Sequence, residues 1–279
     1  MLDSPQVAGF VYRNFVFSSD RCSLHHMSGW IHDTYDLSQD EWIPDTDPIR
    51  DENTFYDACA IQENIYVFGL VKANENYLPV KVYSSKTDEW RLIKVEVISE
   101  TTQPSSMRCK SVIIDGKIFI FEFDVSNAEF ITSVNRVLEY DPISDESKVR
   151  DHEIEFYLQY PYAPNVLVNG RKVWFVSRYI LGRIGDPSSS KILKAVVFDV
   201  DNKSTTEKKI YFPTEFCGSI EMTKHGNDVY GVYTQYIDNK EVSKISRFSF
   251  VGDDIVHDSF YVKQFDHKNI IARFILSNF

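Results

Sequence analysis

The sequence predicts an all-β fold in which a unit of about 50 residues and four strands recurs along the chain. The first observation behind this prediction is the aromatic content, 14% of the 279 residues, because aromatic side chains suit pleated, half-buried strands. The second is a short sequence pattern, called the phrase below, that occurs three times. It begins with a tyrosine, has an Asp-Glu pair five and six positions later, and ends at the seventh position. A repeat of this period indicates stacked units rather than one ordinary core. The three copies of the phrase run from Tyr35 through Asp40-Glu41 to Trp42, from Tyr83 through Asp88-Glu89 to Trp90, and from Tyr140 through Asp145-Glu146 to Ser147.

Each unit is expected to consist of a hairpin, a loop, a third strand, a polar turn and a fourth strand. The clearest hairpin signals are Asp115-Gly116 and Asn169-Gly170, each between two apolar runs, because these residues tolerate positive φ. The first hairpin is expected to turn at Arg13-Asn14. In every unit the third strand ends at an aromatic anchor. The five anchors are Tyr35, Tyr83, Tyr140, Phe198 and Phe248.

Four strands in a unit of this length are typical of a propeller blade. We therefore expect residues 1–279 to form a single β-propeller domain of about five four-stranded blades, approximately at residues 7–47, 55–99, 107–157, 163–212 and 216–263. The tail, residues 264–279, adds a closing strand. This strand either completes a blade with the N-terminal strands or belongs to an incomplete sixth blade. A β-sandwich also needs many strands, but it would not repeat the same sequence phrase at the same position in successive units.

The composition excludes several classes of function. A net charge of −11 repels phosphate backbones, so nucleic-acid binding is not expected. The N-terminal residues form neither a secretory segment nor a membrane span. The cysteines contain no CxxC pair, which argues against a structural zinc site and a disulfide framework and favours a cytoplasmic or nuclear location. They are widely separated: Cys22, Cys59, Cys109 and Cys217.

The second unit resembles the kelch repeat, in which a strand ending in a glycine pair precedes a separated Tyr and Trp. Its strand Ile65–Gly69 is followed by Tyr83 and Trp90, although Leu70 stands where the second glycine is expected. The chain is therefore similar to a divergent kelch-repeat β-propeller. The resemblance implies that the aromatic residues of the phrase are structural blade anchors, and that the chain is a non-catalytic protein–protein interaction module, such as a substrate-recognition or scaffold subunit. These anchors are Tyr35, Trp42, Tyr83, Trp90 and Tyr140, with Phe198 and Phe248 in the later units.

A protein partner is expected to bind the long loops on one face of the propeller, because long loops on a rigid scaffold often carry binding sites. The five loops are Ser18–Gly29, Leu70–Leu78, Glu122–Asn135, Ser177–Ile192 and Thr234–Glu241. Arg and Tyr are typical interface anchors. The candidate contact residues are Arg21, His25, His26, Tyr77, Phe130, Arg178, Tyr179, Arg183 and Tyr236.

No catalytic motif of the G-x-S-x-G, P-loop or H-E-x-x-H type occurs in the sequence. The densest set of metal-ligating residue types is His25-His26 with His32 and Asp33, but neighbouring loop histidines are more often exposed polar residues. We therefore expect no catalytic residues, no cofactor and no bound metal, and hence no enzyme.

The alternative is a five-bladed propeller hydrolase that acts on a glycoside or a nucleotide at its central mouth. It would need several carboxylates on the first strands of the units. The candidates are Asp57, Glu221 and Asp115, although Asp115 belongs to a hairpin turn. A sugar-binding lectin without catalysis is a third possibility. Carboxylates around an open mouth would favour the hydrolase, whereas a mouth filled by apolar side chains would exclude it.

Overall fold

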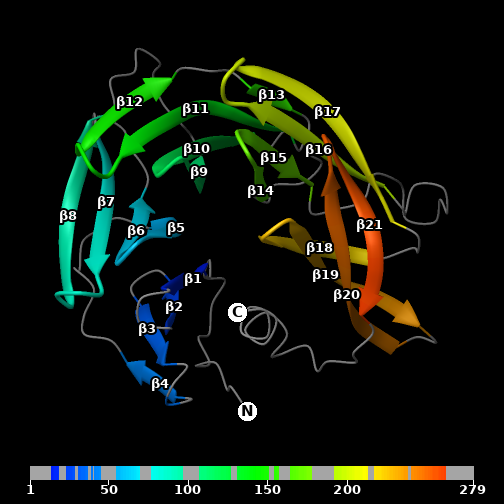
Figure 1. The fold of residues 1–279 in the computed structure, drawn as a ribbon, viewed down its shortest axis with the longest axis horizontal. Coiled ribbons are helices and arrows are strands. Elements are labelled where there is room, and N and C mark those ends of the chain that lie inside the picture. Colours follow the sequence, from blue (N-terminus) through cyan, green and yellow to red (C-terminus); the bar gives the residue numbers. More distant parts are fainter. Residues whose placement is uncertain are drawn as a thin grey trace. The chain divides into compact units, whose positions relative to one another are not determined.

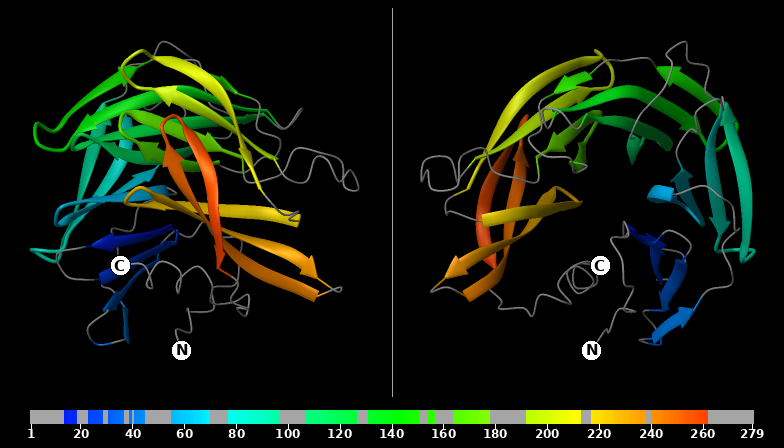
Figure 2. Two further views of the ribbon diagram at one scale, coloured as in Figure 1. Left: turned by 45° about the vertical axis from the view of Figure 1, so that its right-hand side comes forward. Right: turned by 180° about the vertical axis from the view of Figure 1, so that it is seen from behind.

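The computed structural model describes 21 β-strands and no helix in the residues that it places (Figure 1). None of these residues belongs to a helix long and apolar enough to cross a membrane. The strands form five sheets, and in four of them the strands follow one another in chain order (Figure 2). In the fifth, β9–β12 follow chain order and β13 pairs with β11. The described residues are 14–18, 23–28, 31–36, 39, 41–44, 55–69, 77–96, 107–126, 131–150, 154–156, 164–177, 192–212, 217–237 and 240–261.

The chain divides into two compact units, and each is described by itself. The N-terminal unit comprises Val7–Ser126 and Thr132–Glu155, and the C-terminal unit comprises Met1–Gln6, Asn127–Ile131 and Phe156–Phe279.

The N-terminal unit holds three sheets. The first consists of β1 (Asn14–Ser18), β2 (Ser23–Ser28), β3 (Ile31–Asp36) and β4 (Glu41–Pro44). The second consists of β5 (Phe55–Ile61), β6 (Asn64–Gly69), β7 (Tyr77–Ser84) and β8 (Glu89–Glu96). The third consists of β9 (Met107–Ile114), β10 (Lys117–Ser126), β11 (Ile131–Asp141) and β12 (Glu146–Arg150), and β13 (Ile154–Phe156) pairs with β11 as a fifth strand.

The C-terminal unit holds two sheets. One consists of β14 (Asn165–Asn169), β15 (Lys172–Val176), β16 (Ile192–Asp199) and β17 (Ser204–Tyr211). The other consists of β18 (Cys217–His225), β19 (Asp228–Ile237), β20 (Lys240–Val251) and β21 (Asp254–Tyr261).

A meander of four antiparallel strands is the blade topology of a β-propeller. Four of the sheets are blades of this kind, whereas the sheet of β9–β12 carries the additional strand β13. The all-β class predicted from the sequence is thus confirmed for the described residues. Within each unit, neighbouring sheets contact each other through their first strands, β5 beside β1 and β9, and β14 beside β18. Their last strands also approach each other, β8 near β12 and β17 near β21.

The burial of the strands explains their composition. The third strands β7 and β16 are covered on both faces, so their sequences are near-continuous apolar runs. The fourth strands β8 and β17 are mostly exposed edge strands and carry many charged residues, which discourage edge-to-edge pairing.

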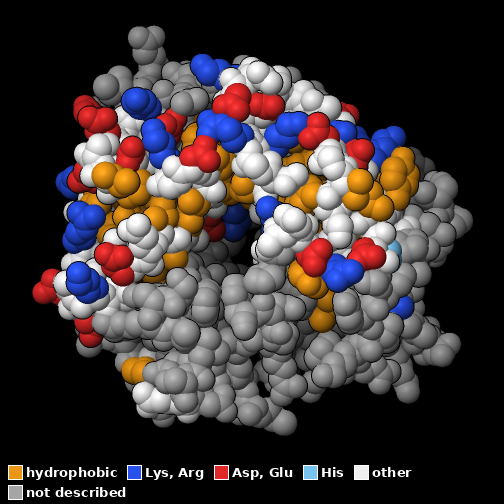
Figure 3. Space-filling model, viewed as in Figure 1, with side chains coloured by type: hydrophobic (Ala, Val, Ile, Leu, Met, Phe, Trp, Pro, Cys, Tyr) orange, Lys and Arg blue, Asp and Glu red, His pale blue; other side chains and the backbone are white. Residues whose placement is uncertain are grey.

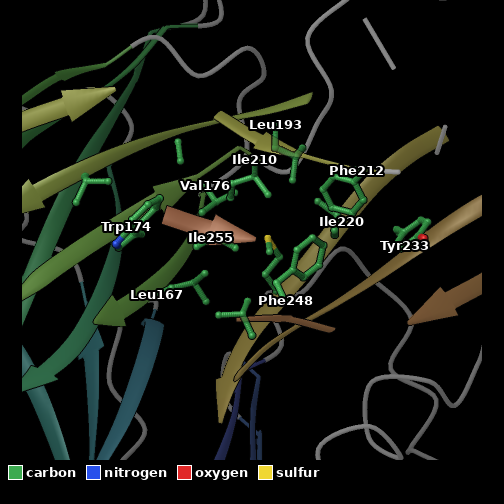
Figure 4. Close-up of a cluster of buried hydrophobic side chains, with 14 residues drawn as sticks. Leu167, Trp174, Val176, Leu193, Ile210, Phe212, Ile220, Tyr233, Phe248 and Ile255 are labelled. Atoms are coloured by element: carbon green, nitrogen blue, oxygen red, sulfur yellow. The ribbon is translucent and has the colours of Figure 1, made fainter. Parts of the chain in front are cut away.

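Three apolar clusters form the described core. One lies between the sheets of β5–β8 and β9–β12 and contains Tyr66, Phe68, Ile118 and Tyr140. A smaller one, around Tyr83, lies on the other face of the β5–β8 sheet. Figure 4 shows the third, where side chains of β14–β17 pack against those of β18–β21 in the C-terminal unit. Apolar burial therefore joins the sheet of β5–β8 to that of β9–β12, and the sheet of β14–β17 to that of β18–β21.

The hairpin predictions had mixed outcomes. Asp115 and Gly116 form the turn between β9 and β10, with φ of 52° and 75°. The Asn169-Gly170 prediction was wrong by one residue, because Asn169 pairs with Lys172 and leaves Gly170 and the next residue in the turn. The first hairpin prediction was also wrong, since Asn14 already belongs to β1, which pairs with β2.

The repeated phrase has a definite structural role in the second and third sheets. The hydroxyl of Tyr83 donates a hydrogen bond to Asp88 Oδ1 at 2.6 Å, and that of Tyr140 donates one to Asp145 Oδ1 at 2.5 Å. Both aspartates lie in turns between third and fourth strands, with φ of 59°. Each aspartate is thus an exposed turn residue that accepts a hydrogen bond from a buried tyrosine.

The predicted blade anchors lie at the expected ends of third strands or on the strands opposite. Tyr83, Tyr140, Phe198 and Phe248 are buried, and the rings of Tyr83 and Trp90 lie 5.2 Å apart. Tyr35 and Trp42 are register partners across β3 and β4.

Candidate functional site

The most concentrated polar chemistry on the inner strands of the N-terminal unit surrounds Asp57. This residue lies on β5, on the same face as Cys59, and is only 5% exposed. Its Oδ1 accepts a hydrogen bond from Lys110 Nζ at 2.9 Å. Its Oδ2 accepts two, from Ser111 N at 2.5 Å and from Ser111 Oγ at 2.8 Å. One carboxylate on β5 therefore holds two consecutive residues of β9.

A second carboxyl group, that of Glu122, lies close to this cluster. Glu122 is on β10, directly opposite Cys109 of β9, and its exposure is 0%. Because alternate residues of a strand share a face, Glu122 points to the same side as Ile118 and Ile120, toward the apolar cluster between the two sheets. A carboxyl group that is buried among apolar side chains is energetically expensive, and such groups are often functional.

The two cysteines of the site report on its electrostatics. Burial raises the pKa of Cys59, and the negative charge of Asp57 raises it further, while a hydrogen bond with Ser111 lowers it in part. Burial also raises the pKa of Cys109, and the charges of Asp57 and then Glu122 add to this effect. Both thiols therefore stay protonated at physiological pH and are poor nucleophiles. The Cys109 thiol lies within the electrostatic reach of both carboxyl groups.

The site lies near the loop end of the blades. Asp57 is close to the start of β5, and Glu122 is in the half of β10 that leads away from the hairpin turn and toward β11. At this site the Asp57 carboxylate is held by three donors, and the Glu122 carboxyl group is fully buried on the inner strand β10. Because both thiols are protonated, the site is not suited to nucleophilic thiol chemistry.

Four of the residues that sequence analysis proposed for partner binding are among the described residues, and they lie on other strands than Asp57 and Glu122. His25 and His26 belong to β2, Tyr236 belongs to β19, and Tyr77 begins β7, where the Lys94 ammonium lies 4.3 Å from the centre of its ring. The other five candidates lie outside the described residues: Arg21, Phe130, Arg178, Tyr179 and Arg183.

Three of the five expected long loops are largely strand. β2 occupies much of Ser18–Gly29, β10 continues to Ser126 before β11 begins at Ile131, and β19 and β20 leave only residues 238–239 between them. In the second and third of these places, aromatic and β-branched residues extend the ladders of β10, β11 and β19. The expectation of five long binding loops was therefore wrong in these three places.

Of the three carboxylates considered for a hydrolase, Asp115 lies in the hairpin turn where it was predicted. Glu221 lies on β18 of the C-terminal unit and is half-buried. Sequence reasoning missed Glu122, Lys110 and Ser111. An alignment of the first hairpins would have drawn attention to Lys110, because it stands as far before its turn as Asp57 does.

The charged residues form mixed pairs on the described surface. Figure 3 shows Lys and Arg side chains beside Asp and Glu side chains on the visible face. Lys208 Nζ lies 2.8 Å from Asp254 Oδ1, and Lys172 Nζ lies 2.6 Å from Asp253 Oδ1. The described part of this face does not concentrate the net negative charge in one patch.

Comparison with known proteins identifies a fold but no family. No protein-family model matches the sequence, so the kelch-repeat identity is not confirmed, and no curated protein matches it either. Among solved structures, the chain is similar to YjhT, with a TM-score of 0.54 and 11% identity over 93% of this chain and 87% of that chain.

Two glycoside hydrolases are also similar in structure. One is a GH32 β-fructofuranosidase from Bombyx mori, a mutant in complex with sucrose, with a TM-score of 0.54 and 10% identity over 89% of this chain. The alignment spans only 62% of that enzyme's chain. The other is a GH43 α-L-arabinofuranosidase from Clostridium thermocellum, with a TM-score of 0.52 and 12% identity over 91% of this chain and 94% of that chain. At these identities the likeness concerns the fold.

These similarities correct two sequence-based expectations. We expected a non-catalytic kelch-like interaction module and no enzyme. The propeller structures that the chain resembles include sugar-cleaving enzymes of two families, which favours the hydrolase alternative over the interaction module.

Proposed function

We propose that this protein is a glycoside hydrolase of the β-propeller type, with Glu122 as its general acid. The observation that carries the proposal is a fully buried carboxyl group on an inner strand of a blade. The similarity in fold to two glycoside hydrolases supports the choice of substrate class.

The chemistry of glycoside cleavage explains why Glu122 suits this role. The general acid must carry a proton and give it to the oxygen of the leaving group. Apolar surroundings disfavour the charged form of a carboxyl group, so a buried glutamic acid can keep its proton at neutral pH. Glu122 shares its face of β10 with Ile118 and Ile120, and the opposite residue is Cys109, whose thiol stays neutral.

The test compares two buried glutamates of the same sheet. Hydrolysis of aryl arabinofuranosides, aryl xylosides and sucrose is measured for the wild type, Glu122→Gln and Glu139→Gln. Glu139 is a matched control because it is buried on the neighbouring strand β11 but faces the opposite side, where Lys117 Nζ donates to it at 2.9 Å. Loss of a general acid lowers kcat by about 10²–10⁴-fold.

We expect this loss in Glu122→Gln and less than about a tenfold loss in Glu139→Gln. The proposal is wrong if the wild type cleaves none of these substrates, or if both variants lose activity equally. An activated aryl glycoside gives a further check, because its leaving group needs little protonation and should restore part of the activity of Glu122→Gln.

For the architecture, we propose that the sheet of β9–β12 with β13 is a fifth blade, and that the chain is a divergent kelch-like propeller. The Tyr–Asp contact in the second and third sheets supports a common blade repeat. A cytoplasmic or nuclear location stays a prediction from the sequence.

A further inference from the structure

A side chain on β14 joins two first strands of the C-terminal unit in the way that Asp57 joins β5 and β9. Asn165 is 4% exposed, and its Nδ2 donates to Ile220 O at 2.9 Å. Its Oδ1 accepts a hydrogen bond from Met222 N at 3.0 Å. Both partners are backbone atoms of β18. One amide side chain on β14 therefore binds a carbonyl and an N–H group of β18, as a neighbouring strand in the same sheet would.

Asp57 and Asn165 occupy the same place in their blades. Asp57 stands four residues before Ile61, the last paired residue of its hairpin, and Asn165 stands four residues before Asn169, the last paired residue of its own.

The backbone N–H groups that the two residues bind are also equivalent. Ser111 stands three residues before Ile114, and Met222 stands three residues before His225, the last paired residues of their hairpins. We call each of these two side chains, Asp57 and Asn165, with its hydrogen bonds to the neighbouring sheet a clamp. Each clamp connects matching positions of two adjacent sheets. Such a match at two places in the chain indicates a recurring structural device.

The two clamps differ in one respect that the chemistry explains. An amide can donate and accept, so Asn165 binds both a carbonyl and an N–H group of β18. A carboxylate only accepts, and Asp57 therefore takes its additional hydrogen bonds from Lys110 Nζ and Ser111 Oγ. Lys110 also compensates the charge of a carboxylate that is almost fully buried.

We infer that Asp57 is a positioning residue, which holds β9 beside β5 and thereby places Glu122 on the neighbouring strand β10, and that it is not a catalytic carboxyl group. Both oxygens of Asp57 are already engaged by three donors. Attack on a sugar or activation of water would require these hydrogen bonds to be given up. The positioning of Glu122 rests on the proposed glycosidase function, whereas the clamp itself does not.

Asp57→Asn is the decisive variant because its amide oxygen can still accept from Ser111 N, as Asn165 Oδ1 accepts from Met222 N, but it has no carboxylate for catalysis. We expect its kcat to stay within about fivefold of the wild type. Replacing a catalytic carboxylate would instead lower kcat by about 10³-fold or more. Asp57→Ala removes the clamp, and we expect kcat to fall at least tenfold below that of Asp57→Asn, so that the amide rescues activity.

Urea unfolding provides a readout that does not depend on activity. We expect Asp57→Ala to lower the equilibrium constant for folding about 30-fold or more. Asp57→Asn should lower it less, by about tenfold, because an amide oxygen can still accept from Ser111 N whereas the charge that pairs with Lys110 is lost. The control is Asp254→Ala, because Asp254 also accepts from a lysine, Lys208, but is exposed, and its loss should change the constant by less than about threefold. Asn165→Ala should behave like Asp57→Ala.

Two results would overturn the inference. The first is an Asp57→Asn protein that is folded and more stable to urea than Asp57→Ala but whose turnover is abolished, because Asp57 would then be catalytic. The second is an Asp57→Ala protein no less stable than Asp254→Ala, because the clamp would then be absent. If the wild type cleaves no glycoside, the proposed function fails, and the unfolding comparison still decides whether Asp57 is a clamp.

Discussion

At the scale of single residues, the contact between tyrosine and aspartate explains why the phrase repeats. The turns after β7 and β11 each contain one residue with positive φ, an aspartate whose carboxylate lies within reach of the tyrosine hydroxyl five residues earlier. In the fourth sheet the anchor is Phe198, which has no hydroxyl, and Lys203 occupies the same offset with φ of 53°. The fourth sheet therefore keeps the turn residue with positive φ but lacks the hydrogen bond between tyrosine and aspartate.

Removal of one of these hydroxyls should lower stability measurably. We expect Tyr140→Phe to reduce the free energy of unfolding by about 1–2 kcal/mol, because a buried ring keeps its packing but loses a hydrogen bond to a charged group. Urea unfolding at pH 7 measures the effect. Tyr211→Phe is the control, since Tyr211 is 61% exposed. Equal stability of the two variants would show that the Tyr140 hydroxyl contributes nothing.

A pH dependence is expected from His257 on β21. Burial lowers the pKa of His257 below its ordinary value, and the nearby charge of Asp258 raises it only in part. The folded chain then binds the proton less tightly than the unfolded chain. The resulting stability is present above about pH 6.5, the unfolded pKa of histidine, and is lost as the pH falls through the folded pKa.

Replacement of His257 should therefore flatten the acid side of the stability profile. We expect the urea midpoint of the wild type to fall more steeply between pH 7 and pH 5 than that of His257→Phe, which keeps an aromatic ring against Phe248. Parallel profiles for the two proteins would mean that His257 does not couple folding to protonation.

At the scale of elements, the first hairpins show how far local sequence determines a turn. Asp115-Gly116 was predictable because Asp and Gly both tolerate positive φ. The register at Asn169 was not predictable from the turn residues, because the pairing of Asn169 with Lys172 depends on which faces of the strands are buried. The hairpin of β5 and β6 turns at Gln62 with φ of 53°, where the corresponding turn residues of later hairpins, Gly170 and Gly226, are glycines.

Gln62 should therefore be a place where the chain can be stabilised. Gln62→Gly relieves the left-handed conformation, which costs a non-glycine residue about 1–2 kcal/mol, against an entropic loss of about 0.5–1 kcal/mol. Because Gln62 is exposed, we expect a net gain of about 0.5–1 kcal/mol in the free energy of unfolding. The reverse change, Gly170→Ala, should lower it by about 1 kcal/mol, and a loss of stability in Gln62→Gly would contradict the argument.

At the scale of the whole molecule, the all-β class was predictable because it depends on local patterns. The alternation of apolar residues and the repeated phrase both lie within one blade. The candidate site was not predictable in the same way. Asp57 acquires its partners from β9, and Glu122 faces a cluster that two sheets build together. Such contacts depend on which strands become neighbours, and one blade's sequence does not contain that information.

The two compact units should respond separately to the loss of a core side chain. Phe248 belongs to the apolar cluster of the C-terminal unit, and Phe68 belongs to that of the N-terminal unit; both are fully buried. Replacing either by Ala leaves a cavity that costs about 3–5 kcal/mol. Because amide exchange reports local opening, Phe248→Ala should accelerate hydrogen exchange mainly in β14–β21, and Phe68→Ala mainly in β5–β12. Equal acceleration throughout the chain in both variants would instead show that the two units open as one cooperative body.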